Sequence, residues 1–246
     1  MSSRSDFGQT TALVLAGGLG TRLSSVVADR PKALAPVRGR PFLSYLLDQI
    51  RAAGVRRAVL CTGHLGDQIE AAFGGSYREV ALEYSREATP VGTGGALALA
   101  AERVVGSSAP VLILNGDSYC GVDLEELWHW HHSRFAHATL VAVQVPDASR
   151  FGRLDLDAHG RIVGFHEKSA QPRPGLVNGG IYLVRTEALA CIATGRPVSL
   201  EREVFPAWTR SGLYGFPTNG RFIDIGTPES FREAERFVRE LTPEAA

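Results

Sequence analysis

The stretch Leu13–Leu23, LVLAGGLGTRL, decides the fold, and the stretch Arg30–Val37, RPKALAPV, lies shortly after it. The apolar run Thr11–Ala16 has the length and the residue types of a buried strand. The glycines at positions 17, 18 and 20 end this strand with a turn whose backbone carries no Cβ atoms. Successive free N–H groups on such a strand-to-helix turn form a concavity that binds anions. The stretch therefore predicts a phosphate-binding loop.

Two better-known glycine loops do not fit this stretch. A dinucleotide-binding fingerprint that starts at Gly18 requires a third glycine where Leu23 stands. A P-loop requires Lys-Ser or Lys-Thr directly after its last glycine, where this chain has Thr21 and Arg22. Here Thr21 can add a hydroxyl donor to the loop, and Arg22 a rigid guanidinium fork. The sequence favours a phosphate-binding loop of another kind.

Length and charge limit the classes of function. The chain has 246 residues, enough for one large α/β domain, and we expect a single domain in which residues 1–10 form a flexible tail. Lys plus Arg and Asp plus Glu both number 26, so the formal net charge is zero. This balance argues against a nucleic-acid partner and against a membrane partner. The sequence shows neither an apolar run that could span a bilayer nor a signal-peptide core, so we expect a cytoplasmic protein.

Strand and helix patterns alternate along the chain. Residues 41–53 place apolar side chains on one helical face, residues 55–62 read as a second buried strand, and residues 66–73 as a second helix. Such β-α-β-α order predicts a parallel sheet covered by helices, with ligands at the carboxyl ends of the strands. We expect residues 220–228 to end the sheet and residues 229–241 to form a closing helix. The predicted fold is α/β, a Rossmann-like doubly wound, predominantly parallel mixed sheet with helices on both faces.

Two aspartates stand where a metal ion could bind. Asp117 comes after the apolar strand 110–114, and a carboxylate at the end of a central strand beside a triphosphate is a typical ligand of Mg²⁺. Asp117 could instead cap a turn or the next helix. Asp224 lies between Ile223 and Ile225, where a carboxylate is costly unless it is paired or bound to a metal.

A second glycine-rich segment spans residues 85–96, SREATPVGTGGA. We expect it to open a helix from Ala96 to Val104, whose N-terminus points free N–H groups at the crevice. The same glycines could also serve close helix packing alone. Contact with a ligand is the favoured interpretation.

Taken in order, these motifs resemble the signature of sugar-1-phosphate nucleotidylyltransferases. The matching positions are Gly-Gly-x-Gly-Thr-Arg-Leu at 17–23, Pro-Lys at 31–32 and Pro-Val at 36–37. The resemblance continues to about Phe237 and includes a helical segment, 200–206, of the kind that this family places after its sugar pocket. It implies the nucleotide-diphospho-sugar transferase fold. It also implies transfer of a nucleotidyl group from a nucleoside triphosphate to a sugar 1-phosphate, with release of pyrophosphate.

The resemblance further implies a role for each site residue. The catalytic positions are Arg22, Lys32, Asp117 and Lys168. The nucleotide-binding positions are Leu15, Ala16, Gly17, Gly18, Gly20, Thr21, Glu87, Gly92 and Thr93. The sugar-binding positions are Asn115, Glu167, Asn178 and Gly179. Asp117 and Asp224 are expected to bind one Mg²⁺ together.

The sequence indicates the substrates less specifically than it indicates the family. Several stretches most resemble D-glycero-α-D-manno-heptose 1-phosphate guanylyltransferases, which makes GTP and that heptose 1-phosphate the expected substrates. Mannose 1-phosphate guanylyltransferases and N-acetylmuramate 1-phosphate uridylyltransferases are the alternatives, and a catalytically silent regulatory subunit that binds nucleotide-sugars is an alternative of another class. The chain could also form a homo-oligomer.

Base choice depends on Glu87 and Gly92 in this interpretation. A carboxylate only accepts hydrogen bonds, and guanine offers two adjacent donors, N1–H and the exocyclic amine. Uracil offers one donor between two carbonyl oxygens, which a carboxylate repels. The glycine at position 92 resembles the guanylyl enzymes rather than the muramate enzyme. The sequence therefore favours GTP.

Overall fold

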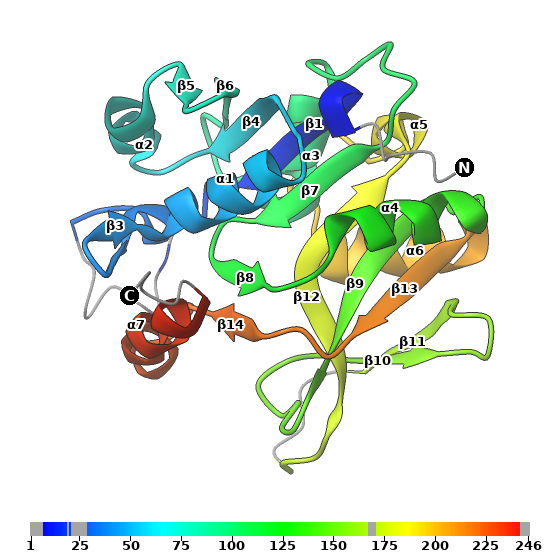
Figure 1. The fold of residues 1–246 in the computed structure, drawn as a ribbon. Coiled ribbons are helices and arrows are strands. Elements are labelled where there is room, and N and C mark those ends of the chain that lie inside the picture. Colours follow the sequence, from blue (N-terminus) through cyan, green and yellow to red (C-terminus); the bar gives the residue numbers. More distant parts are fainter. Residues whose placement is uncertain (1–6, 19, 21–28, 167–170, 242–246) are drawn as a thin grey trace.

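The computed structural model describes residues 7–18, 20, 29–166 and 171–241 (Figure 1). Within them, ten strands form one sheet in the order β11-β10-β12-β7-β1-β4-β6-β5, with β9 beside β12 and β13 beside β9. Its strands are β1 Thr11–Leu15, β4 Arg57–Thr62, β5 Ser76–Tyr77, β6 Val80–Arg86, β7 Val111–Asn115, β9 Ala138–Val145, β10 Arg153–Leu156, β11 Ile162–His166, β12 Gly175–Val184 and β13 Leu213–Thr218. Two small sheets pair β2 (Pro36–Val37) with β3 (Arg40–Pro41) and β8 (Ser118–Cys120) with β14 (Phe222–Asp224).

The strands β7, β1, β4 and β6 run parallel to one another. Their carboxyl ends meet at one edge, because Leu15 at the end of β1 lies opposite Cys61 in β4 and Asn115 in β7. On the other side of β7 the sheet is mixed, since β12 pairs antiparallel with β7, β9 and β10. The predicted α/β fold with a mixed sheet is confirmed, and its parallel part carries the strand ends at which ligands are expected.

Both faces of the sheet are buried. In β1, Ala12 and Val14 belong to one hydrophobic cluster, and Leu13 between them belongs to the other, as the period of two in a strand requires. Helices α1, α2, α4 and α7 contribute to the first cluster, and α3, α5 and α6 to the second, which confirms helices on both faces (Figure 1). The helices are α1 Phe42–Ala52, α2 Gly66–Phe73, α3 Gly92–Ala101, α4 Leu124–Ser133, α5 Thr186–Ala190, α6 Phe205–Trp208 and α7 Pro228–Leu241.

The structure differs from the sequence-based expectation at the end of the sheet. Strand β13 was not predicted, because Gly215 and Pro217 interrupt its pattern. The structure accommodates both, since β13 lies at the edge of the sheet: its continuous ladder is with β9, and on its other side only a single bridge joins Tyr214 to Arg161. Residues 220–228 do not end the large sheet, because β14 pairs with β8 in a sheet of its own.

Two further boundaries are corrected. Helix α3 begins at Gly92 rather than Ala96, and the backbone N–H groups of Gly94 and Gly95 donate to the Val198 carbonyl oxygen at 2.8 and 3.3 Å. Residues 7–10 do not behave as a tail, because Phe7 lies in a short 3₁₀ helix, is buried, and packs against Trp128 with ring centroids 4.8 Å apart.

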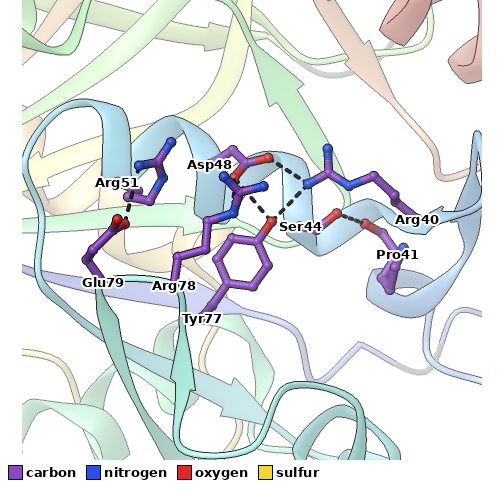
Figure 2. Close-up of polar contacts among 8 residues, drawn as sticks. All are labelled: Arg40, Pro41, Ser44, Asp48, Arg51, Tyr77, Arg78 and Glu79. Carbon is purple, nitrogen blue, oxygen red and sulfur yellow. Dashed lines mark hydrogen bonds and ion pairs between the residues drawn. The ribbon is translucent and has the colours of Figure 1, made fainter.

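A polar network joins α1 to the hairpin of β5 and β6 (Figure 2). The Tyr77 hydroxyl donates to Asp48 Oδ1 at 3.1 Å and accepts from Arg40 Nη2 at 2.8 Å, and the same Arg40 nitrogen donates to Asp48 Oδ2 at 2.6 Å. One turn along α1, Arg51 Nη1 pairs with Glu79 Oε2 at 3.2 Å. These contacts fix one sheet edge to the helix that covers it.

The part of the chain that the structure describes contains no helix that is both long and apolar enough to cross a membrane.

Buried His131 predicts a dependence of stability on pH. This α4 residue is 3% exposed, its Nδ1 lies 2.9 Å from the Thr139 hydroxyl, and burial lowers its pKa to about 3. Below the ordinary histidine pKa of about 6.5, this side chain is protonated in the unfolded chain but stays neutral in the folded one. The free energy of unfolding therefore falls as the pH falls. Between pH 7 and pH 5 the wild type should lose about 2 kcal/mol more free energy of unfolding than His131→Gln.

Urea unfolding at the two pH values measures this difference. His129→Gln, on the exposed face of α4, is the matched control and should keep the wild-type pH slope. Equal slopes for the wild type and His131→Gln would contradict the assignment.

Candidate functional site

A cavity of about 420 Å³ opens at the carboxyl ends of β1 and β7. Its lining includes many of the residues that the sequence predicts for the site: Leu15, Ala16, Gly17, Gly18, Lys32, Glu87, Gly92, Thr93, Asn115, Asp117 and Asp224. The lining also includes residues that were not predicted: Ala33, Pro90, Ala96, Gly116 and Glu201.

Close backbone packing forms the floor of the cavity. The Ala16 N–H donates to the Cys61 carbonyl oxygen at 2.8 Å, and the Gly116 N–H donates to the Leu15 carbonyl oxygen at 2.9 Å. A Cβ atom at Gly116 would lie 2.6 Å from that same Leu15 oxygen. Glycine is therefore required at position 116, because only glycine lets the end of β7 bring Asp117 against the glycine loop.

Glu87 is held in the wall of the cavity. Its Oε2 accepts a hydrogen bond from the Val91 N–H at 3.2 Å. Its Oε1 lies where Cβ atoms at Gly17 and Gly63 would come within 2.9 and 2.5 Å. Two glycines on neighbouring strand ends thus make room for this carboxylate, which keeps free lone pairs for a ligand.

Lys32 bridges the glycine loop and the first aspartate. Its Nζ lies 3.3 Å from Asp117 Oδ2, and its side chain is only 15% exposed. Its methylene groups pack beside Gly20, where a Cβ atom would lie 3.2 Å from Lys32 Cγ. The ammonium group is therefore held between Gly20 and Asp117, and its role in positioning phosphates stays a prediction.

Asp224 lies beside Asp117 although the two are far apart in the sequence. Asp224 is opposite Ser118 in the β8–β14 pair, and the Ile225 N–H donates to the Asp117 carbonyl oxygen at 2.9 Å. Its Oδ1 accepts from the Gly226 N–H at 2.8 Å. Burial, and next the Asp117 charge, raise the pKa of Asp224.

This pair of carboxylates fits a divalent cation. Carboxylate oxygens are hard ligands that Mg²⁺ prefers, and a cation would offset the repulsion between the two charges. Within the described residues no group of three or more His, Cys, Asp or Glu side chains could hold a metal. Substrate phosphates and water would therefore supply the remaining ligands, as is usual for Mg²⁺.

A chain of hydrogen bonds links two predicted sugar-binding residues. Asn178 Nδ2 donates to the Tyr182 hydroxyl at 3.0 Å, and that hydroxyl donates to Asn115 Oδ1 at 3.4 Å. Tyr182, for which the sequence predicted no role, therefore holds the two asparagines together.

Gly179 does not line the cavity, because it packs on β9, where a Cβ atom would lie 2.7 Å from Val143 Cγ2.

Four predicted site residues, Thr21, Arg22, Glu167 and Lys168, lie outside the described residues, and their roles stay predictions. Glu201 is the unpredicted charged residue of the cavity. The sequence signal that could have found it is an acidic residue in the partly apolar segment 200–206, LEREVFP, which was predicted as a helical segment of the kind that the family places after its sugar pocket.

Comparisons with known proteins agree with this geometry. A family model described as nucleotidyl transferase matches residues 11–240. The chain belongs to this family. Nucleotidyl transferases of this kind are enzymes that generally use a divalent metal ion.

Two relatives of this nucleotidyl transferase are named as guanylyltransferases of sugar 1-phosphates. It is 39% identical, over 97% of its own length and 67% of the relative, to mannose-1-phosphate guanylyltransferase of Mycobacterium tuberculosis. It is 34% identical, over 92% of its length and 96% of the relative, to D-glycero-alpha-D-manno-heptose 1-phosphate guanylyltransferase of Aneurinibacillus thermoaerophilus. The crystal structure of HddC from Yersinia pseudotuberculosis complexed with GMP-PN superposes with a TM-score of 0.81 at 30% identity, covering 93% of this chain and 99% of that one.

Asp117→Asn and Asp224→Asn should each lower turnover by orders of magnitude while the protein still folds, because each removes one charge from the pair of carboxylates that would hold the cation. Without metal, Asp224→Asn should be at least as stable as the wild type, since it relieves a buried charge beside Asp117. Turnover at limiting Mg²⁺ and thermal unfolding with and without Mg²⁺ measure both effects. Asp67→Asn, on the exposed face of α2, is the control. Near-normal turnover of both site variants at limiting Mg²⁺ would disprove the metal assignment.

Proposed function

We propose that this nucleotidyl transferase transfers a guanylyl group from GTP to a sugar 1-phosphate, with D-glycero-α-D-manno-heptose 1-phosphate as the preferred acceptor. The observation that carries the proposal is one cavity that unites a glycine loop, Lys32 and the carboxylates of Asp117 and Asp224. The products are a GDP-sugar and pyrophosphate.

The proposed reaction needs no covalent intermediate. A phosphate oxygen of the sugar 1-phosphate attacks the α-phosphorus in line, a new P–O bond forms, and the bond to the bridging oxygen breaks as pyrophosphate leaves. The loop N–H groups and Lys32 hold phosphate oxygens, so positioning and electrostatics supply most of the acceleration. Mg²⁺ on Asp117 and Asp224 would supply positive charge at the phosphoryl group. We also propose Arg22 for the triphosphate and Lys168 for the sugar phosphate.

The position of Glu87 supports guanine as the base. Its carboxylate faces the cavity between Gly17 and Gly63 and can accept from the two adjacent donors of guanine. The names of the relatives and the GMP-PN complex of HddC agree with this choice. Transfer of a uridylyl group to N-acetylmuramate 1-phosphate remains the alternative for the base.

The relatives support two acceptors. The heptose 1-phosphate guanylyltransferase matches along 96% of its length, which favours heptose. The mannose-1-phosphate guanylyltransferase has the higher identity, 39%, but the match spans 67% of it, so mannose 1-phosphate is the second candidate. A single domain, a cytoplasmic location and assembly into a homo-oligomer stay predictions.

A panel of nucleoside triphosphates against heptose, mannose and N-acetylmuramate 1-phosphates tests the proposal. Pyrophosphate release should be most efficient with GTP and the heptose 1-phosphate. A higher efficiency with mannose 1-phosphate would support the second candidate. A preference for UTP would reject guanylyl transfer, and no release with any pair would favour a silent nucleotide-sugar-binding subunit.

Glu87→Gln should reduce the preference for GTP over UTP roughly ten- to a hundredfold, the usual effect of breaking a paired polar contact to a charged group. The measurement is the ratio of kcat/KM for the two triphosphates. Glu79→Gln, on the β5–β6 hairpin outside the cavity, should leave the ratio unchanged. An unchanged ratio in Glu87→Gln would refute this role.

A further inference from the structure

Glu201 is an acidic residue of the cavity lining to which neither the sequence motifs nor the proposed metal site assigns a role. It lies in the short helical segment Leu200–Val204, and its side chain lines the cavity together with Thr93 and Asn115. Both proposed substrates bear phosphate groups, which a carboxylate repels. A carboxylate in this cavity is favourable only where it contacts a part of a substrate that donates hydrogen bonds.

The protein fixes one oxygen of this carboxylate. Thr93 Oγ1 donates to Glu201 Oε2 at 3.2 Å, and Ser199 Oγ donates to the same oxygen at 3.0 Å. Thr93 Oγ1 also accepts from the Leu200 N–H at 2.9 Å, which ties α3 to the segment that carries Glu201. Among the residues that the structure describes, no donor reaches Oε1. The group is therefore held in place with one oxygen free to accept.

The charge of Glu201 is not neutralised by a neighbouring base. Of the two glutamates in this segment, Glu203 forms an ion pair with Arg196 at 2.6 Å and lies outside the cavity lining. Within the described part of the chain no Lys, Arg or His forms an ion pair with Glu201. An unpaired carboxylate that is held by hydroxyl groups and faces a cavity is suited to a neutral ligand rich in hydroxyl groups.

Glu201 shares the cavity lining with Asn115, which the resemblance assigns to the sugar. Burial raises the pKa of the Tyr182 hydroxyl, and the Glu201 charge adds to that rise, so the two groups are within electrostatic reach. The Tyr182 hydroxyl is the link between Asn178 and Asn115. Uncharged amide and hydroxyl groups are the usual partners of sugar hydroxyls, whereas the phosphate end of the cavity has Lys32.

We propose that Glu201 determines sugar specificity by accepting hydrogen bonds from ring hydroxyls of the sugar 1-phosphate. This inference rests on the proposed function, because it deepens the assignment of the acceptor substrate. The selected acceptor is a sugar 1-phosphate whose sugar ring is uncharged and has a free hydroxyl at the position that Glu201 Oε1 reaches.

The test compares the wild type, Glu201→Ala and the control Glu203→Gln with D-glycero-α-D-manno-heptose 1-phosphate and its monodeoxy analogues. Glu201→Ala should weaken binding of the heptose 1-phosphate roughly ten- to a hundredfold, as expected for a hydrogen bond to a charged group. The dissociation constant for GTP alone should change less than about twofold. In the wild type one deoxy analogue should lose a similar factor, and in Glu201→Ala the same analogue should lose nothing further, since the partner is already absent.

Calorimetric binding reads this out without turnover, so it separates two failures. A wild type that binds the sugar 1-phosphate but releases no pyrophosphate from GTP contradicts the proposed function and still tests Glu201. Deoxy analogues that lose equal factors in the wild type and in Glu201→Ala would overturn the inference. It would also be overturned if Glu201→Ala weakened GTP but not 2′-deoxy-GTP or 3′-deoxy-GTP, which would assign the carboxylate to ribose. Normal unfolding temperatures of each variant exclude misfolding as the cause.

Discussion

The site depends on how the end of β1 is held between the ends of β4 and β7. Two backbone hydrogen bonds, Ala16 N–H to Cys61 O and Gly116 N–H to Leu15 O, extend the parallel pairing past the last strand residues. They bring three chain segments together at one edge: the glycine N–H groups after β1, Gly63 after β4, which makes room for Glu87, and Asp117 after β7. Because the last contact requires glycine at position 116, a larger residue there would separate the loop from the carboxylate.

Local pattern and motif were enough to predict many elements of the fold and much of the site. Buried strands, helical faces and the α/β alternation were visible from periodicity, and the resemblance identified Lys32, Asp117 and Asp224 as parts of one site. Periodicity alone could not show that Asp224 lies beside Asp117, because their proximity arises from the pairing of β14 with β8. The roles of Gly63 and Glu201 were missed because they depend on side chains that approach from distant segments. Strand β13 was missed because its glycine and proline are unfavourable in a strand interior but are tolerated at an edge.

The charge of the cavity differs from that of the chain as a whole. The sequence is formally neutral, but the described lining contains Glu87, Asp117, Glu201 and Asp224 against the ammonium group of Lys32. Such a lining opposes the entry of a free triphosphate, and a cation bound to the triphosphate would reduce that opposition. The acidic groups also have distinct partners: Glu87 faces two glycines, Glu201 is held by hydroxyl groups, and the aspartates face each other. Under the proposed function, the same kind of charged group would serve three different kinds of ligand atom.

The late position of Asp224 in the chain has a consequence for biosynthesis. Helix α7 begins a few residues after β14, and its Ala234, Phe237 and Val238 are buried in the hydrophobic cluster that α1 also joins. A chain that leaves the ribosome N-terminus first carries the glycine loop, Lys32 and Asp117 long before it carries Asp224 and the helix that packs behind it. The nascent protein therefore cannot bring its two aspartates together until β14 has been made and can pair with β8.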